Sequence, residues 1–106
     1  MSTLDDREKA FEKKFAHDEE AKFRLKAKRN RLLGLWAANL LGKEADEADI
    51  YALEVVTSDL SRPDEEDVVA KIHGDFREAG LAISNGEIRT QMSELLAKVM
   101  AENEAS

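Results

Sequence analysis

Histidine is the side chain most often used for acid–base catalysis and metal binding, and this sequence has two, His17 and His73. Neither has a second ligand at the spacing of a helical metal site, so both are predicted to be surface or boundary residues. The acidic run at 64–67 lacks the ligand spacing and the glycine of a calcium-binding loop. We interpret it as charge that complements the positive end of a helix dipole. The sequence therefore predicts no metal site.

Motifs for nucleotide chemistry and nucleophilic catalysis are also missing from the sequence. Neither G-x-x-x-x-G-K-S/T nor G-x-G-x-x-G occurs, so no phosphate-cradling loop is predicted. The chain has no cysteine, and no Ser/His/Asp arrangement has a readable spacing. We expect a protein that is not an enzyme, with no catalytic residue and no cofactor. Weak binding of ADP or ATP on the folded body stays an open alternative.

Positive charge is concentrated in one short segment of an acidic chain. The 106 residues carry a net charge of −7. Residues 21–31 nevertheless contain no acid, and we call their six bases the basic collar: Lys22, Arg24, Lys26, Lys28, Arg29 and Arg31. The collar could bind phosphates or a membrane surface. An acidic body would repel both, so pairing with that body or with a partner protein is favoured, and neither nucleic-acid binding nor membrane insertion is expected.

Composition and apolar spacing predict an all-α fold. Ala, Glu, Lys, Leu and Arg dominate, and these residues favour helices. Gly42 is placed to end the first helix, and Gly34 inside that helix could allow another helix to approach closely. The predicted core face of the first helix is a stripe of residues at steps of seven and four, with three further residues beside it: Leu25, Leu32, Trp36 and Leu40, then Leu33, Ala37 and Leu41.

Three further helices are predicted after residue 42. The second runs from about residue 46 to 60, the third follows Pro63 and ends at Gly80, and the fourth begins at the S-x-x-E capping sequence Ser84–Glu87. Because the connections are short, a small four-helix bundle is the expected architecture. The predicted core positions are, in order, Ile50, Leu53, Val56 and Leu60; Val69, Ile72, Phe76 and Ala79; and Ile88, Met92, Leu95, Leu96 and Val99.

The first twenty residues differ from the rest. Their apolar side chains form only a narrow line of Leu4, Phe11 and Phe15, and charge fills nearly everything else. An isolated helix of this length is marginally stable in water. We therefore divide the chain into residues 1–20, a mobile and partly helical arm that is disordered or marginally helical when free, and residues 21–106, the bundle. Such an arm is typical of a segment that orders on binding a partner.

Residues 5–42 resemble the zeta subunit family of α-proteobacterial F1FO-ATP synthases. The specific elements are REKAFE, KFA and DEE in the arm, then RN, LLGLWAA and LLG in the first helix. The second half agrees more loosely, and Ala21 departs from the bulkier residue expected there. Its matching residues are Glu66-Asp67-Val68, Lys71, Asp75-Phe76, Ile88-Arg89, Met92 and Glu94-Leu95-Leu96.

This resemblance implies an inhibitor subunit whose arm inserts at a catalytic interface of the F1 head, among its alpha, beta and rotor subunits, and blocks ATP hydrolysis. It implies a cytoplasmic protein held at the inner membrane through the F1FO complex. A non-inhibitory F1-binding or assembly factor is the alternative. The implied apolar contacts are Leu4, Phe11 and Phe15, and the implied polar contacts are Arg7, Glu8, Lys9, Glu12, Lys13 and Lys14.

Overall fold

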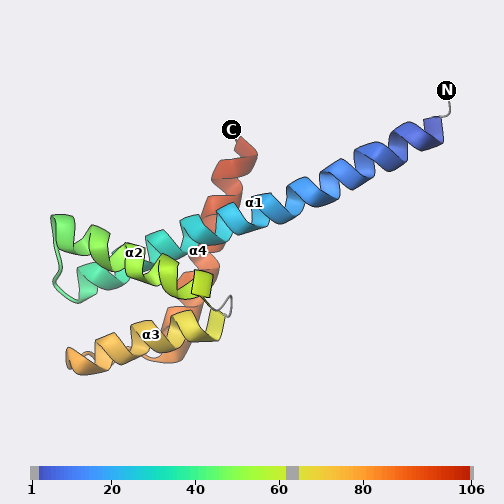
Figure 1. The fold of residues 1–106 in the computed structure, drawn as a ribbon. Coiled ribbons are helices and arrows are strands. Elements are labelled where there is room, and N and C mark those ends of the chain that lie inside the picture. The colour runs from blue at the N-terminus through green and yellow to red at the C-terminus, as the bar shows by residue number, and fades with distance from the viewer. Residues whose placement is uncertain (1–2, 62–64, 106) are drawn as a thin grey trace.

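Four helices make up the part of the chain that the structure describes. In this computed structural model the backbone is described for residues 3–61 and 65–105, and the side chains for residues 20–59 and 65–103. The helices are α1 (Thr3–Leu40), α2 (Ala45–Ser61), α3 (Glu65–Glu78) and α4 (Asn85–Ala105) (Figure 1). No strand occurs in these backbone ranges. The prediction of an all-α, four-helix protein is confirmed.

The helices pack around the C-terminal part of α1. Helix α1 contacts α2 and α4, and α3 contacts the same two helices from the other side of the core. The N-terminal part of α1 extends away from the other three helices (Figure 1). Helix α2 begins and ends within one residue of the predicted bounds of 46 and 60. The connection after α1 is short, and α2 packs against α1.

Glycines with positive φ angles end α1 and α3 as predicted. Gly42 has φ of 79° and Gly80 has φ of 77°, values that side chains other than glycine rarely adopt. After Gly42, the backbone N–H of Lys43 donates to the carbonyl of Ala38 at 2.9 Å, which is the long bond of a Schellman motif. The equivalent bond closes α3 at 2.8 Å. In both helices, carbonyl groups of the last turn therefore accept hydrogen bonds from backbone N–H groups just after the helix, which ends the helix there.

The start of α4 has the predicted serine cap. The backbone N–H of Glu87 donates to Oγ of Ser84 at 3.1 Å, and Ser84 immediately precedes the first residue of the helix. This bond satisfies one of the amide donors that a helix start leaves without a partner. The first turn of α3 carries Glu65, Glu66 and Asp67, whose charges complement the helix dipole there.

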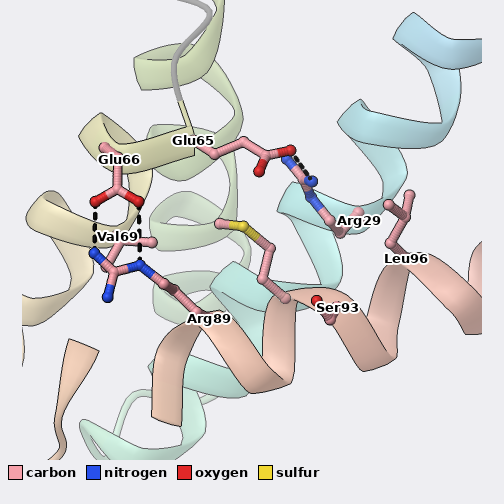
Figure 2. Close-up of a pocket in the computed structure, with 8 residues that line it drawn as sticks. Arg29, Glu65, Glu66, Val69, Arg89, Ser93 and Leu96 are labelled. Atoms are coloured by element: carbon pink, nitrogen blue, oxygen red, sulfur yellow. Dashed lines mark hydrogen bonds and ion pairs between the residues drawn. The ribbon is translucent and has the colours of Figure 1, made fainter. Parts of the chain in front are cut away.

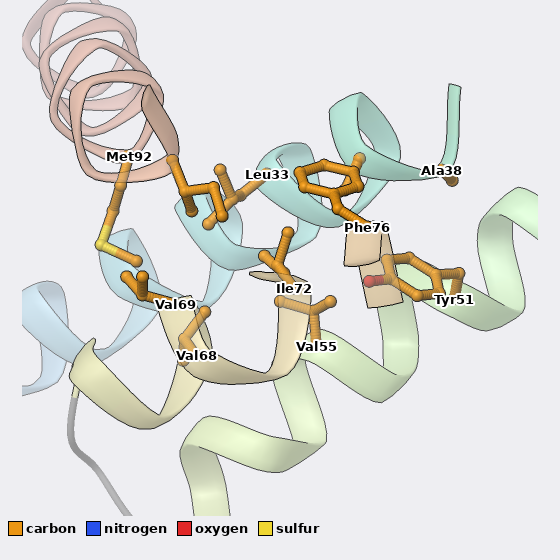
Figure 3. Close-up of a cluster of buried hydrophobic side chains, with 11 residues drawn as sticks. Leu33, Ala38, Tyr51, Val55, Val68, Val69, Ile72, Phe76 and Met92 are labelled. Atoms are coloured by element: carbon orange, nitrogen blue, oxygen red, sulfur yellow. The ribbon is translucent and has the colours of Figure 1, made fainter. Parts of the chain in front are cut away.

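A single apolar core lies where the four helices meet (Figure 3). At its centre Phe76 of α3 is fully buried, and its ring meets that of Trp36 of α1 edge-on, with centroids 5.8 Å apart. The core draws on all four helices, and its buried members are Leu33, Ala37, Ala38, Tyr51, Val55, Val68, Val69, Ile72, Phe76, Ile88 and Met92.

The predicted core face of α1 is right in part, because Leu33 and Ala37 belong to the core and Trp36 and Leu41 pack against it, but its centre lies one position further around the helix. Leu33 and Ala37, expected beside the stripe, are fully buried, whereas Leu32 and Trp36 are half-buried and Leu40 is exposed. Consecutive apolar residues at 32–33 and 36–38 fit either face, so the periodic pattern does not choose between them.

The predicted core face of α2 is wrong at Ile50 and Leu53, whereas Val56 is half-buried and the side chain of Leu60 lies outside the described residues. Tyr51, Ala52 and Val55 are buried, while Ile50 is 60% and Leu53 is 64% exposed. The contact with α1 provides the reason. A Cβ added to Gly34 would lie 2.7 Å from Cα of Ala52, so two small residues meet where the backbones of α1 and α2 approach most closely. This contact turns the larger Ile50 and Leu53 away from the core.

The core faces of α3 and α4 largely agree with the sequence. Val69, Ile72 and Phe76 of α3 are buried, and Val68 joins them, whereas Ala79 lies beyond the end of the helix and is exposed. In α4 the predicted residues Ile88, Met92 and Val99 are buried, and Leu95 and Leu96 are half-buried.

Candidate functional site

The predicted partner-binding residues all lie in the N-terminal part of α1. Leu4, Arg7, Glu8, Lys9, Phe11, Glu12, Lys13, Lys14 and Phe15 have side chains outside the described residues, which begin at Glu20. The backbone there belongs to α1, which has 38 residues and so a length of about 57 Å. The molecule measures 65 × 25 × 21 Å, so α1 sets its long dimension. The division of the chain at residue 20 falls inside this one helix and stays a prediction.

A buried polar network fixes the place where α1 enters the bundle. Arg29 is 1% exposed, and its Nη1 donates to Oε1 of Glu65 at 2.9 Å (Figure 2). Its Nε and Nη2 donate to Oδ1 of Asn30 at 3.1 and 3.0 Å, and Nδ2 of Asn30 donates to Oδ2 of Asp59 at 2.9 Å. The network therefore ties α1 to the end of α2 and to the start of α3.

This network divides the basic collar into one structural residue and five exposed ones. Arg29 pairs with the acidic body, as favoured from the sequence. Among the others, Arg24 has only a weak contact with Glu20 at 3.9 Å, and both side chains are largely exposed. Five exposed cations therefore follow the predicted arm directly, with Lys22 and Lys26 on one side of α1 and Arg24, Lys28 and Arg31 on the opposite side.

A second ion pair joins α3 to α4 beside the first. Arg89 donates through Nε to Oε1 of Glu66 at 3.1 Å and through Nη2 to Oε2 at 2.6 Å, a fork-to-fork arrangement (Figure 2). The hydrogen bonds from Arg89 lower the pKa of the Glu66 carboxyl below its usual 4.5, and the same bonds raise the pKa of Arg89. Both ion pairs line a shallow pocket of about 200 Å³ with Val69, Met92 and Leu96.

Tyr51 links α2 to α3 on the opposite side of the core. Its hydroxyl donates to Oδ2 of Asp75 at 2.7 Å, and Lys71 Nζ lies 3.3 Å from the same oxygen. Burial of the phenol raises its pKa well above the usual 10, and the hydrogen bond to Asp75 and the negative charges of Asp75 and Glu54 raise it further. Tyr51 is therefore a permanent hydrogen-bond donor near neutral pH, and its role here is structural.

The residues first considered for metal chemistry gain no support. His73 is half-buried on α3, as predicted for a boundary residue, and His17 lies outside the described side chains. Within the described part of the chain, no group of three metal-ligating side chains is close enough to hold an ion. Among those residues, no helix is both long and apolar enough to cross a membrane.

Two features of the described residues were not predicted from the sequence. The burial of Arg29 and Asn30 has no signal in composition, because both residue types are usually exposed. The exposure of Ile50 and Leu53 contradicts their predicted core role. A small residue in each of the two facing helices, Gly34 and Ala52, was the available signal for the second feature, but it identifies a packing face only once the two helices are known to be neighbours.

Comparison with known proteins identifies the family. The family model described as ATPase inhibitor subunit zeta matches residues 1–102. A solved structure titled "Solution NMR structure of the protein" is 38% identical with a TM-score of 0.68, and the match covers 79% of this chain and 95% of that chain. No curated protein matches the chain. Because the family model spans nearly every residue, the chain belongs to the ATPase inhibitor subunit zeta family.

Proposed function

We propose that this protein inhibits ATP hydrolysis by inserting residues 1–20 at a catalytic interface of the F1 head of the ATP synthase, among the alpha, beta and rotor subunits. The observation that carries the proposal is the family match over residues 1–102, because the family is described as an ATPase inhibitor subunit. A regulatory subunit of this kind acts by binding and has no reaction of its own to catalyse. It would work in the cytoplasm, at the inner membrane only through the F1FO complex.

The shape of α1 supports this mechanism. Its N-terminal part extends away from the bundle (Figure 1), and a single helix is narrow enough to enter between two subunits. The other end of α1 is locked by Arg29 and by the contact of Gly34 with Ala52. Because the bundle holds one end of α1, the projecting end can enter the partner while the bundle stays outside it.

The residue pattern of the arm supports binding of moderate affinity that can be regulated. Leu4, Phe11 and Phe15 would be the apolar anchors, since aromatic side chains dominate the energetics of many interfaces. The charged residues between them would set orientation and register. Fixing the side chains of the arm on binding costs free energy, so moderate affinity is expected.

The proposal is tested by changing the anchors in the full-length chain. We expect Phe11→Ala with Phe15→Ala to raise the concentration needed for half-inhibition of F1-ATPase by about tenfold or more. Phe23→Ala is the matched control, because Phe23 is an exposed phenylalanine of the same helix outside the arm. Equal inhibition by the anchor variant and the unchanged chain would refute insertion of the arm. Binding of the unchanged chain without slower hydrolysis would instead select a non-inhibitory binding or assembly role.

A further inference from the structure

Helix α2 carries an apolar face that none of the other described helices covers. Ile50 and Leu53 are 60% and 64% exposed and lie three positions apart, so they share one side of the helix. A partner that covers these two large apolar side chains removes their surface from water, which favours binding. We call this surface, with its flanking grooves, the α2 face.

Leu53 forms a ridge between two grooves. The groove toward α1 has a volume of about 450 Å³ and is lined by Ala27, Lys28, Arg31, Asp49, Leu53 and Val56. The groove on the other side has about 470 Å³ and is lined by Ile50, Leu53, Glu54, Thr57, Ser58 and Lys71. A ridge with a groove on each side is the surface against which a further helix packs. The α2 face therefore fits an added helix better than it fits a small compact ligand.

The charges around the α2 face select the chemistry of that helix. Lys28 and Arg31 are exposed at the α1 edge, and neither forms an ion pair with another described residue. At the other edge Lys71 lies 3.6 Å from Glu54, so that positive charge is already compensated. The groove toward α1 also contains Asp49, so its formal charge is +2 − 1 = +1, which favours carboxylates on the incoming helix beside its apolar stripe.

The position of the α2 face points to the same partner as the arm. Lys28 is thirteen residues from Phe15 along α1, which corresponds to about 20 Å of helix. A partner that holds the arm is therefore within reach of the α2 face without any change in the bundle. Two linked contacts reinforce each other, because the first raises the effective concentration of the second.

We propose that the α2 face is a second docking surface, which binds an amphipathic helix with an apolar stripe and an acidic edge on the outside of the ATPase head. This inference rests on the proposed function, because it takes the partner of the arm as the partner of the α2 face. In this proposal the bundle contributes to the free energy of binding and also holds the arm in place. The exposed pair Ile50 and Leu53 supplies the apolar contact, and Lys28 and Arg31 set its orientation.

Affinity for the isolated F1 head tests the proposal in the full-length chain. Leu53→Asp with Ile50→Asp should weaken binding by about tenfold or more, because it places charge against the apolar stripe of the partner. Met100→Asp is the control, since Met100 is 45% exposed on α4. Lys28→Glu with Arg31→Glu should weaken binding more at low salt than at high salt, whereas Lys98→Glu should not. Unchanged helical circular dichroism confirms that each variant is folded.

Cross-linking locates the contact directly. Because the chain has no cysteine, Leu53→Cys can carry a single photo-reactive label. We expect that label to join the chain to a subunit of the ATPase head, and a label on Met100→Cys to give no such product.

The outcomes separate this inference from the proposed function. If the unchanged chain does not bind or inhibit the ATPase, the proposed function fails, and this inference fails with it. If the unchanged chain inhibits while the α2-face variants bind equally well, only the second docking surface is wrong. If sedimentation shows that the chain is a dimer and that Leu53→Asp makes it a monomer, the α2 face joins two copies of the chain, which also overturns the inference.

Discussion

At the scale of single residues, Arg29 is the member of the basic collar that has a structural role. Its guanidinium is buried beside Asn30 and makes three of its possible hydrogen bonds there, two to Asn30 and one to Glu65. Glu65 is half-exposed, so water shares in balancing the charge. A buried arginine with such partners specifies one arrangement of α1, α2 and α3, since a shift of any of them leaves polar atoms without partners.

Removal of the Arg29 side chain should therefore destabilise the bundle. We expect Arg29→Ala to lower the free energy of unfolding by about 2 kcal/mol, because Asn30 loses two donors inside the protein. Arg31→Ala, which removes an exposed member of the collar, should change it by less than about 0.5 kcal/mol. Urea denaturation of the two variants measures the difference. Equal stability of both would contradict a structural role for Arg29.

The Glu66–Arg89 pair predicts a dependence of stability on pH. The folded-state pKa of Glu66 lies below its usual 4.5, so its stabilising effect is present above that pH and is lost as the pH falls through the folded-state pKa. The melting temperature of Glu66→Gln should trail that of the unchanged chain near neutral pH, and the gap should narrow as the pH falls below 4.5. Glu94→Gln on α4 is the control. A gap that persists in acid would contradict the assignment.

At the scale of helices, the packing of α1 on α2 depends on two small residues. Gly34→Ala would place a Cβ 2.7 Å from the backbone of Ala52, so the helices must separate. We expect a loss of roughly 1–3 kcal/mol in the free energy of unfolding. Gly74→Ala in α3 meets nothing within 4 Å and should instead stabilise by roughly 0.5–1 kcal/mol, as alanine does in an open helix. Thermal and urea unfolding of the pair check both signs, and a stabilising Gly34→Ala would refute the close contact.

The cap of α4 gives a second prediction at this scale. Ser84→Ala should cost about 1 kcal/mol of unfolding free energy, because the amide of Glu87 loses its partner. Ser93→Ala, an exposed change inside the same helix, should stay within about 0.5 kcal/mol of the unchanged chain. If the two serine variants unfold at the same urea concentration, the cap contributes nothing.

Sequence patterns predicted the elements better than the faces they bury. The end of α1 at Gly42 and the start of α4 at Ser84 follow from local chemistry, and both were predicted. The core face of α2 depends on which residue meets Gly34, and that is a property of two helices together. Since apolar residues surround most of the segment at 50–56, periodicity alone leaves several faces equally suitable. The same difficulty displaced the stripe of α1.

For the candidate site as well, features that depend on local sequence were predicted, and features that depend on tertiary packing were not. The resemblance of residues 5–42 to the zeta family identified the family correctly. The residues proposed to contact F1 remain predictions, because their side chains lie outside the described residues. The buried Arg29 and the exposed α2 face could not be predicted, because each depends on how distant segments pack.

At the scale of the whole molecule, a small core supports one long helix. The core lies around the C-terminal part of α1, yet α1 sets the 65 Å length of the molecule. A bundle of this kind is large enough to fold and too wide to follow α1 into a narrow interface. In the proposed function the arm therefore blocks the ATPase, and the bundle holds the arm in place.

The most direct test of this account is the rate of ATP hydrolysis by an F1 head from an α-proteobacterium, measured with the full-length protein and with a version that lacks residues 1–19. The account predicts that only the full-length protein slows hydrolysis, while circular dichroism shows that the shortened protein keeps its folded bundle. Equal inhibition by both versions would contradict it, because the inhibitory surface would then lie on the bundle.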